Sequence, residues 1–239
     1  MKNLVHFQDL GRQRHYQEIW DYQEELLAAN VKIKQHNRAQ EKLDNPEFLL
    51  TQNHLLFVEH PHVYTLGKSG HIENMLANSE QLEKIEATFV KTNRGGDITY
   101  HGPEQLVGYP IFDLEVFKPD IHLYMRNLEE VIIQTIGEFG LIGERSKGET
   151  GVWLDVGKPF ARKICAMGVK ASRWITMHGF ALNVNTDLRY FEYIIPCGIT
   201  DKAVTSLERE LGRKVAMEEV KKVTLQKFEE VFDLTIVQD

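Results

Sequence analysis

Apolar residues recur at helical spacing in three long stretches of the chain, and each stretch predicts an amphipathic helix. The stretches are residues 14–31, 120–140 and 216–232. In the first, the shared face carries Tyr16, Ile19, Trp20, Leu27 and Val31. The polar residues 34–47 that follow are expected to form a surface connection. A shorter helix is predicted over 79–87, with Ser79 as its N-cap.

Strand-like runs lie between these helices. Residues 54–67 predict two short strands broken at Pro61, and residues 88–114 alternate strand-like runs with a glycine-rich bend. Two further runs occupy 151–185 and are split at 170–173. Because helices and strands do not alternate regularly, we expect an α+β fold. Without a repeat or a linker, the simplest organisation is a single domain over 1–239.

Composition narrows the functional classes. With 239 residues, 42% of them hydrophobic and 26% charged, the chain can bury a sizeable core. It contains two cysteines and no apolar run typical of a signal peptide or a membrane span, so we expect a cytoplasmic, reducing setting. A formal net charge of −7 argues against nucleic acid as a partner. An acidic partner would need a local basic patch, for which the candidates are Arg162, Lys163, Lys170 and Arg173.

Cys197 stands between Pro196 and Gly198, and four roles can be considered for it. A disulfide is disfavoured by the reducing setting, and a metal site lacks cysteine and histidine at ligand spacing. A buried packing residue and a catalytic nucleophile remain open. The nucleophile is favoured by the setting, because proline restricts the preceding conformation and glycine permits an open turn.

A thiol nucleophile requires an activating group, because only a few per cent of an ordinary cysteine is thiolate at neutral pH. The candidates are His101, His178 and Lys163. A lysine can favour the thiolate as a nearby cation, or accept its proton when desolvated.

Two other segments combine small and polar residues. Gly95 and Gly96 allow a sharp bend that approaches a ligand, although an ordinary turn is an equally simple interpretation. On a regular strand, Lys163 and Cys165 would face one side together with Met167 and Val169. Gly179 and Ala181 would share a face and leave room for a ligand or for a neighbouring backbone.

Four motifs resemble the lipoyl(octanoyl) transferase family in the same order. They are RGGDITYHGPEQLVGYP, GVWL, RKICAMGVKASRWITMHGFALNVN and the pair IIPCGI and VTSLERELG, and the whole match runs from about His54 to Gly212. The resemblance implies a mixed sheet flanked by helices, similar to the catalytic domain of biotin and lipoate protein ligases. It also implies transfer of an octanoyl group from acyl carrier protein to a lysine of a lipoyl domain, without a cofactor or a metal. The acceptors would be the lipoyl domains of 2-oxoacid dehydrogenase E2 subunits and the glycine cleavage H protein, with no role for nucleic acid or membrane.

The resemblance also implies which residues act. Cys197 would carry the acyl group as a thioester, and Lys163 would be its partner in a Cys/Lys dyad. The implied substrate-binding positions are Arg94, Gly95, Gly96, Asp97, Ile98, Thr99, Tyr100, His101, Ala166, Met167, Gly168, Gly179, Phe180 and Ala181.

Two features depart from the family pattern. Cys165 stands in the lysine motif where a small apolar residue is expected, so it is a rival thiol, although packing is the simpler role. The N-terminal helix and the polar segment after it are longer than the family requires. Three alternative functions remain: an ATP-dependent lipoate–protein ligase, an acyl-domain binding protein without activity, and a cysteine hydrolase. A ligase would keep the lysine but needs no cysteine nucleophile, so Cys197 argues against it, and the presence of both Cys197 and Lys163 argues against the binding protein.

Overall fold

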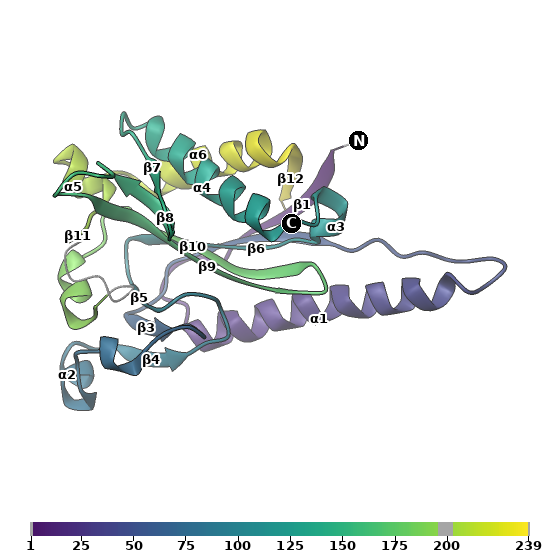
Figure 1. Cartoon of the computed structure of the whole chain (residues 1–239), viewed down its shortest axis with the longest axis horizontal. Coiled ribbons are helices and arrows are strands. Elements are labelled where there is room, and N and C mark those ends of the chain that lie inside the picture. The colour runs from purple at the N-terminus through teal and green to yellow at the C-terminus, as the bar shows by residue number, and fades with distance from the viewer. Residues whose placement is uncertain (1, 196–202, 239) are drawn as a thin grey trace.

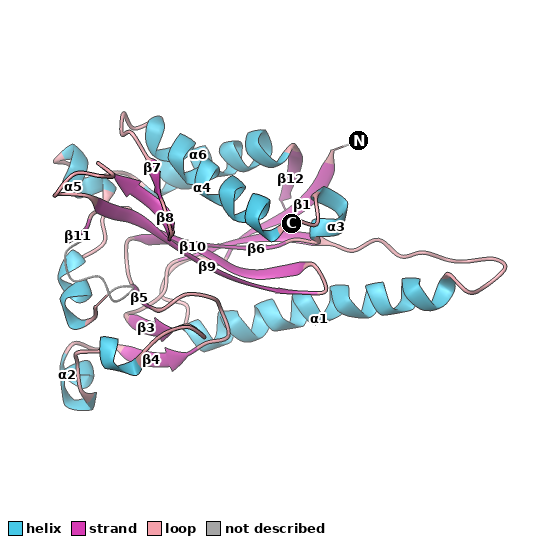
Figure 2. Ribbon diagram, viewed as in Figure 1, coloured by secondary structure: helices cyan, strands magenta, loops and turns pink. Residues whose placement is uncertain are grey.

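The computed structural model describes residues 2–195 and 203–238, and in this part of the chain the strands form one large and one small sheet (Figures 1 and 2). The large sheet has the order β12-β1-β2-β6-β10-β9-β8-β7, with β11 pairing to β9. Parallel pairs such as β1–β2 lie beside antiparallel pairs such as β2–β6, which confirms the predicted mixed sheet. Its strands are β1 (Asn3–Asp9), β2 (Asn53–Val58), β6 (Gln105–Ile111), β7 (Glu144–Ser146), β8 (Glu149–Leu154), β9 (Arg162–Ser172), β10 (Ile175–Asn183), β11 (Ala203–Val204) and β12 (Leu234–Gln238).

The small sheet has the order β4-β3-β5. Its strands are β3 (Val63–Leu66), β4 (Thr88–Lys91) and β5 (Ile98–His101). The two strands predicted on either side of Pro61 are confirmed as β2 and β3, but they enter different sheets. The break at Pro61 is therefore the crossing from the large sheet to the small one.

Helices cover both faces of the large sheet (Figure 1). α4 (Ile121–Gly137) and α6 (Met217–Phe232) lie on one face and form the main core with it, through residues such as Ile132 and Phe228. α1 (Tyr16–Gln40) and the small sheet lie on the other face, where Ile19 and Leu27 pack on Val107 and Met177 in a second core. The shorter helical elements are η1 (Ile72–Asn74), α2 (Ser79–Lys84), α3 (Leu114–Phe117), η2 (Leu188–Tyr193) and α5 (Leu207–Leu211).

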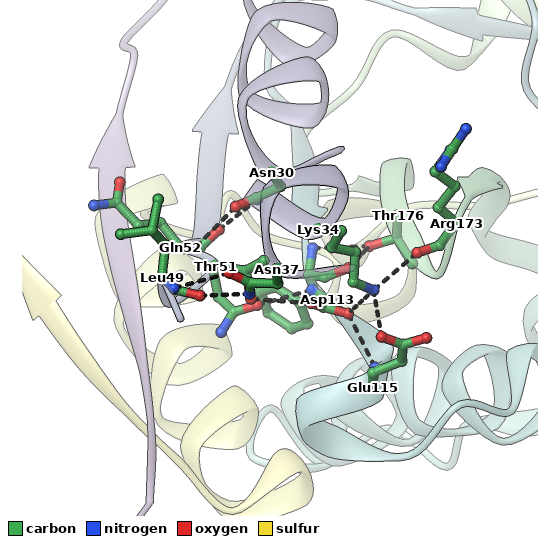
Figure 3. Close-up of polar contacts among 12 residues, drawn as sticks. Asn30, Lys34, Asn37, Leu49, Thr51, Gln52, Asp113, Glu115, Arg173 and Thr176 are labelled. Atoms are coloured by element: carbon green, nitrogen blue, oxygen red, sulfur yellow. Dashed lines mark hydrogen bonds and ion pairs between the residues drawn. The ribbon is translucent and has the colours of Figure 1, made fainter. Parts of the chain in front are cut away.

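The first helix is longer than predicted, and the expectation of a surface connection over 34–47 is wrong for its first half. α1 continues to Gln40, and residues 47–52 then run back along it (Figure 3). Asn37 both donates to and accepts from the backbone of Leu49, and Asn30 does the same with Gln52. These amides satisfy backbone groups of a segment that has no strand partner, so Asn30 and Asn37 have a structural role.

A partly buried ion pair holds the C-terminal half of α1 against the sheet (Figure 3). The Lys34 ammonium lies 2.6 Å from Asp113 and also donates to the backbone carbonyl of Arg173, 2.9 Å away. Asp113 additionally accepts from the Thr51 hydroxyl. The polar residues therefore tie α1, the returning segment and the β9–β10 turn together, which sequence periodicity could not show.

Two local predictions need correction. The N-cap of α2 is Asn78 rather than Ser79, because the Asn78 side chain accepts from the backbone of Gln81 in a capping box. The two strands predicted over 151–185 are not divided at 170–173, since β9 continues to Ser172. The turn consists of Arg173 and Trp174, whose φ angles of 52° and 67° match a two-residue hairpin turn. Among the described residues, no helix is both long and apolar enough to cross a bilayer.

Candidate active site

A cavity of about 610 Å³ opens between the large sheet, the small sheet and the first turn of α1. Lys163 lines it, together with every predicted substrate-binding position except Tyr100. Tyr100 is buried instead in the small sheet, where its hydroxyl pairs with His62 at 2.7 Å. Phe180 borders the cavity, but its ring packs against Phe57 and Phe228 in the main core. Cys197 lies outside the described residues.

Lys163 and Cys165 face opposite sides of the sheet, which contradicts the regular alternation predicted for this strand. Trp153 on β8 pairs with Lys163, and its neighbour Val152 pairs with Cys165, so β9 has an extra residue at Ile164. Because Trp153 and Val152 point to opposite faces, their partners do so as well. Ile164 and Cys165 both pack in the main core, whereas Lys163 lines the cavity.

The Lys163 ammonium lies over the indole ring of Trp153, 4.6 Å from its centroid. A cation in this position is attracted by the electron-rich face of the ring. Trp153 is only 3% exposed, so the ring is a fixed platform for the ammonium. The GVWL motif thus contributes an aromatic contact to the lysine of the next motif.

Cys165 does not have the surroundings of a reactive thiol. Its side chain is fully buried, and burial raises the pKa of the thiol well above its usual range. A reactive cysteine needs solvent access and a lowered pKa. The structure therefore supports the packing role predicted for Cys165.

The Arg94–Asp97 bend is held against β9 by close backbone contacts. Arg94 is 7% exposed and donates to both the carbonyl and the hydroxyl of Thr65, at 2.6 and 2.9 Å. The N–H of Gly95 donates to the carbonyl of Val169 on β9. A Cβ on Gly168 would lie only 2.7 Å from the carbonyl oxygen of Gly95, which explains the glycine in the AMG motif.

His101 and His178, the two other candidate activators, are buried in the cavity wall. Burial lowers the pKa of His101 well below its usual value, and neighbouring His60 and Arg94 lower it further. Burial, with Arg94 and Lys170, lowers the pKa of His178 to about 3. Both rings are therefore neutral at working pH. Of the three candidate activators, Lys163 is partly exposed, whereas both histidines are buried.

Several cavity residues were not predicted from the sequence. Tyr16 comes from α1, Gln105 and Tyr109 from β6, and Asn183 from the end of β10. Tyr16 was assigned to the buried face of a helix, but periodicity alone does not say which surface that face covers. Its ring stacks on His101, with centroids 5.9 Å apart. No local signal in the sequence joins these positions.

The four cationic residues proposed as a basic patch do not form one. Arg162 and Lys170 are eight residues apart on one strand, which corresponds to about 26 Å. Arg162 pairs with Asp155 and Glu210, and Lys170 pairs with Glu24. Their charges are thus largely compensated within the chain. Among the described residues, no three histidine, cysteine, aspartate or glutamate side chains gather as metal ligands would.

The fold of the chain places it in a recognisable structural class. A solved structure described as a bipartite lipoate protein ligase and its E2 lipoyl domain from Thermoplasma acidophilum superimposes with a TM-score of 0.67. The alignment covers 100% of this chain and 87% of the other, at 16% sequence identity, so the likeness is one of fold. The class defined by the fold is that of lipoate-ligase catalytic domains, as the resemblance had implied.

Sequence comparison identifies the family within this class. The family described as the lipoyl protein ligase A/B catalytic domain matches residues 15–229. A protein named octanoyltransferase from Flavobacterium psychrophilum is 60% identical over 238 residues, covering 99% of this chain and 100% of the relative. A second octanoyltransferase, from Flavobacterium johnsoniae, is 61% identical with the same coverage. The chain therefore belongs to the octanoyltransferase branch of the lipoyl protein ligase A/B family, a branch of acyltransferase enzymes.

Proposed function

We propose that the protein transfers an octanoyl group from octanoyl-acyl carrier protein to a lysine of a lipoyl domain through a thioester on Cys197. The acceptors are the lipoyl domains of 2-oxoacid dehydrogenase E2 subunits and the glycine cleavage H protein. The names of the close relatives support the octanoyl group. We also propose a cytoplasmic location, in which Cys197 stays a free thiol.

One observation carries this proposal. Lys163, from one motif, opens onto the same cavity as the Arg94–Gly96 bend and the Gly179–Ala181 segment, which come from other motifs. The cavity combines polar groups with an apolar wall that includes Val107 and Ala181, and an acyl chain needs such a wall. Cys165 is buried on the opposite side of the sheet, which leaves Cys197 as the candidate nucleophile.

The proposed chemistry proceeds in two acyl transfers. Lys163 takes the proton of Cys197, and the thiolate attacks the octanoyl carbonyl. The carbon–sulfur bond to the carrier breaks, and its leaving thiolate takes the proton from Lys163. The acceptor lysine, as a neutral amine, then attacks the Cys197 thioester and gives its surplus proton to the departing sulfur by way of Lys163. Exchange of one thioester for another is nearly neutral and amide formation is downhill, so no ATP is required.

Intact mass spectrometry tests this proposal directly. The protein is incubated with octanoyl-acyl carrier protein in the absence of ATP, and a gain of one octanoyl group is expected. The adduct should disappear in Cys197→Ser and persist in Cys165→Ser. An adduct that is lost only in Cys165→Ser would overturn the assignment of the nucleophile.

The alternatives give different results in the same assay. Octanoylation of a lipoyl domain only when ATP and free octanoate are supplied would indicate a ligase. Release of free octanoate with an acceptor present would indicate a hydrolase. Transfer to the acceptor without ATP, abolished in Cys197→Ser, is the result that the proposal requires.

A further inference from the structure

A chain of hydrogen bonds crosses the floor of the cavity from the Arg94 bend to the strand of Lys163. It passes through side chains on β3, β5, β6 and β10 and ends on the backbone of Thr205, immediately after β11. Its members are buried, each 7% exposed or less. In order, they are Arg94, Thr65, His101, Gln105, Asn183 and Thr205.

The direction of each hydrogen bond, from donor to acceptor, can be assigned by starting at the Thr205 carbonyl. The carbonyl of Thr205 can only accept, so the amide nitrogen of Asn183 donates to it at 2.9 Å. The Asn183 oxygen must then accept from the amide nitrogen of Gln105, also at 2.9 Å. That nitrogen donates to the carbonyl of Tyr100 as well, so the orientation of the Gln105 amide is fixed twice.

The same logic fixes the tautomer of His101. The Gln105 oxygen accepts from Nδ1 of His101 at 2.9 Å, so the proton of this neutral ring is on Nδ1. Nε2 is left as an acceptor and faces the Thr65 hydroxyl at 3.4 Å. Arg94 donates to that hydroxyl, whose own proton is therefore free to point at Nε2.

The far end of the chain reaches the backbone of the candidate catalytic lysine. The N–H of Thr205 donates to the carbonyl of Lys163 at 2.9 Å, and its carbonyl accepts from Asn183. The hydroxyl of Thr205 donates to Glu210, which in turn forms a two-bonded ion pair with Arg162. Thr205 is thus held by three hydrogen bonds, to Lys163, Glu210 and Asn183. Of these three partners, Asn183 is the one that lies on β10.

We propose that Asn183 is a positioning residue, which sets the strand segment of Lys163 at a fixed distance from the His101 and Arg94 side of the cavity. This inference rests on the proposed function, because Lys163 is taken as the partner of the reacting thiol. Asn183 acts through Thr205 and does not touch the reacting atoms. Small displacements of a catalytic group can lower a rate by about 100-fold, so the chain has a kinetic role beyond stability.

Substitutions at Asn183 distinguish this role from packing alone. Asn183→Leu has a similar volume but makes no hydrogen bonds, so the Gln105 amide loses one acceptor and the Thr205 carbonyl loses the Asn183 donor. We expect kcat for octanoyl transfer to fall by about 10- to 100-fold, with KM for the octanoyl carrier changed less than about threefold. A rise in KM for the octanoyl carrier with kcat unchanged would overturn the proposal.

Asn183→Asp provides a second readout that a purely structural role would not move. An ionised aspartate only accepts, so it repels the carbonyl of Thr205, whereas a protonated one donates to it. The other charged or titratable groups on or beside the hydrogen-bond chain are Arg94, His101, Lys163, Glu210 and Arg162, with Tyr16, His60 and His178 facing His101 and Asp155 paired with Arg162. All of them are present in every variant, so a ratio to wild type isolates residue 183.

We expect the activity of Asn183→Asp relative to wild type to rise at least about threefold as pH falls from 8 to 5.5, because burial raises the pKa of the introduced carboxyl. The corresponding ratio for Asn183→Leu should stay flat. Equal pH profiles for the two variants would overturn the proposal.

Asn185→Leu is the matched control. Asn185 lies two residues away and bonds to Glu104 and Val215, outside the chain, so this variant should lose stability with kcat within about threefold of wild type. Thermal unfolding of all three variants identifies any that fails to fold. Absence of a wild-type acyl adduct would reject the proposed function, whereas a normal adduct with unaffected Asn183 variants would reject only this inference.

Discussion

Lys163 and Cys165 are two residues apart on β9 and face opposite sides of the large sheet. The inserted residue at Ile164 separates them. This bulge removes the rival thiol from the cavity while it keeps the lysine there. It also places Cys165 in the core, where burial suppresses its reactivity.

The first prediction concerns this separation. Iodoacetamide should leave Cys165 unmodified in the native protein and modify it after denaturation, because the thiol is fully buried. Peptide mapping by mass spectrometry measures the two states. Cys165→Ala should keep wild-type transfer activity and lose about 1 kcal/mol of stability, or about 2–4 °C in Tm. Native labelling of Cys165 at the rate of an exposed thiol would contradict the assignment.

The second prediction concerns Gly179. A Cβ at this position would lie 2.1 Å from the carbonyl oxygen of Gly108 on the neighbouring strand. Gly179→Ala should therefore destabilise the fold by about 3 kcal/mol, because one of the two strands must move. Chemical denaturation measures the change. The control is Gly137→Ala at the end of α4, where nothing lies within 4 Å of the added Cβ, and equal stabilities of the two variants would refute the argument.

The third prediction concerns acyl-chain length. Ala181 is 3% exposed and lines the cavity from the apolar second core. Ala181→Leu should shorten the space for the chain and lower kcat/KM for octanoyl transfer by about tenfold or more. Transfer of a butanoyl group from the same carrier should change much less. Ala171→Leu on the exposed part of β9 is the control, and an equal loss for both chain lengths would count against a role for Ala181 in the acyl pocket.

The fourth prediction concerns pH and His60. This ring donates from Nδ1 to the carbonyl of Arg14 and accepts the Tyr109 hydroxyl at Nε2. Burial lowers the pKa of His60 from 6.5 to about 4. Below pH 6.5 the unfolded chain binds a proton that the folded protein does not, so stability should fall as pH decreases from 6.5 to 4.

Thermal unfolding across this pH range checks the prediction. In His60→Asn the amide nitrogen can replace the Nδ1 donor and does not titrate. The Tm of this variant should therefore fall less steeply below pH 6.5 than that of the wild type. Parallel curves for the two proteins would show that His60 does not contribute to the acid sensitivity.

Local patterns predicted most elements but not their connections. The helix of α4 and the strands around Pro61 followed from periodicity, because each pattern depends only on neighbouring residues. The extension of α1 to Gln40 was missed since its polar residues 34–40 make their contacts with residues 47–52 and 113. A helical segment whose inward face is polar lacks the apolar periodicity from which a helix is predicted.

The candidate site was predicted unevenly for the same reason. The resemblance to a family supplied Lys163 and the glycine-containing segments, which lie together in the cavity. Tyr100 was included because it lies in the motif, yet its ring turns away into the small sheet. Gln105 and Asn183 were missed because they are 78 residues apart and acquire meaning only through their hydrogen bond.

The sequence by itself determined the family and the character of most helices and strands, and the resemblance to that family supplied the candidate dyad. These properties depend on residue identity and on spacing within short segments. Tertiary structure decided which face Lys163 occupies, which histidines are neutral, and how the cavity floor is connected. The bulge in β9, the burial of the histidine rings and the direction of the hydrogen bonds each depend on atoms from segments distant in the sequence. No local pattern can therefore encode them.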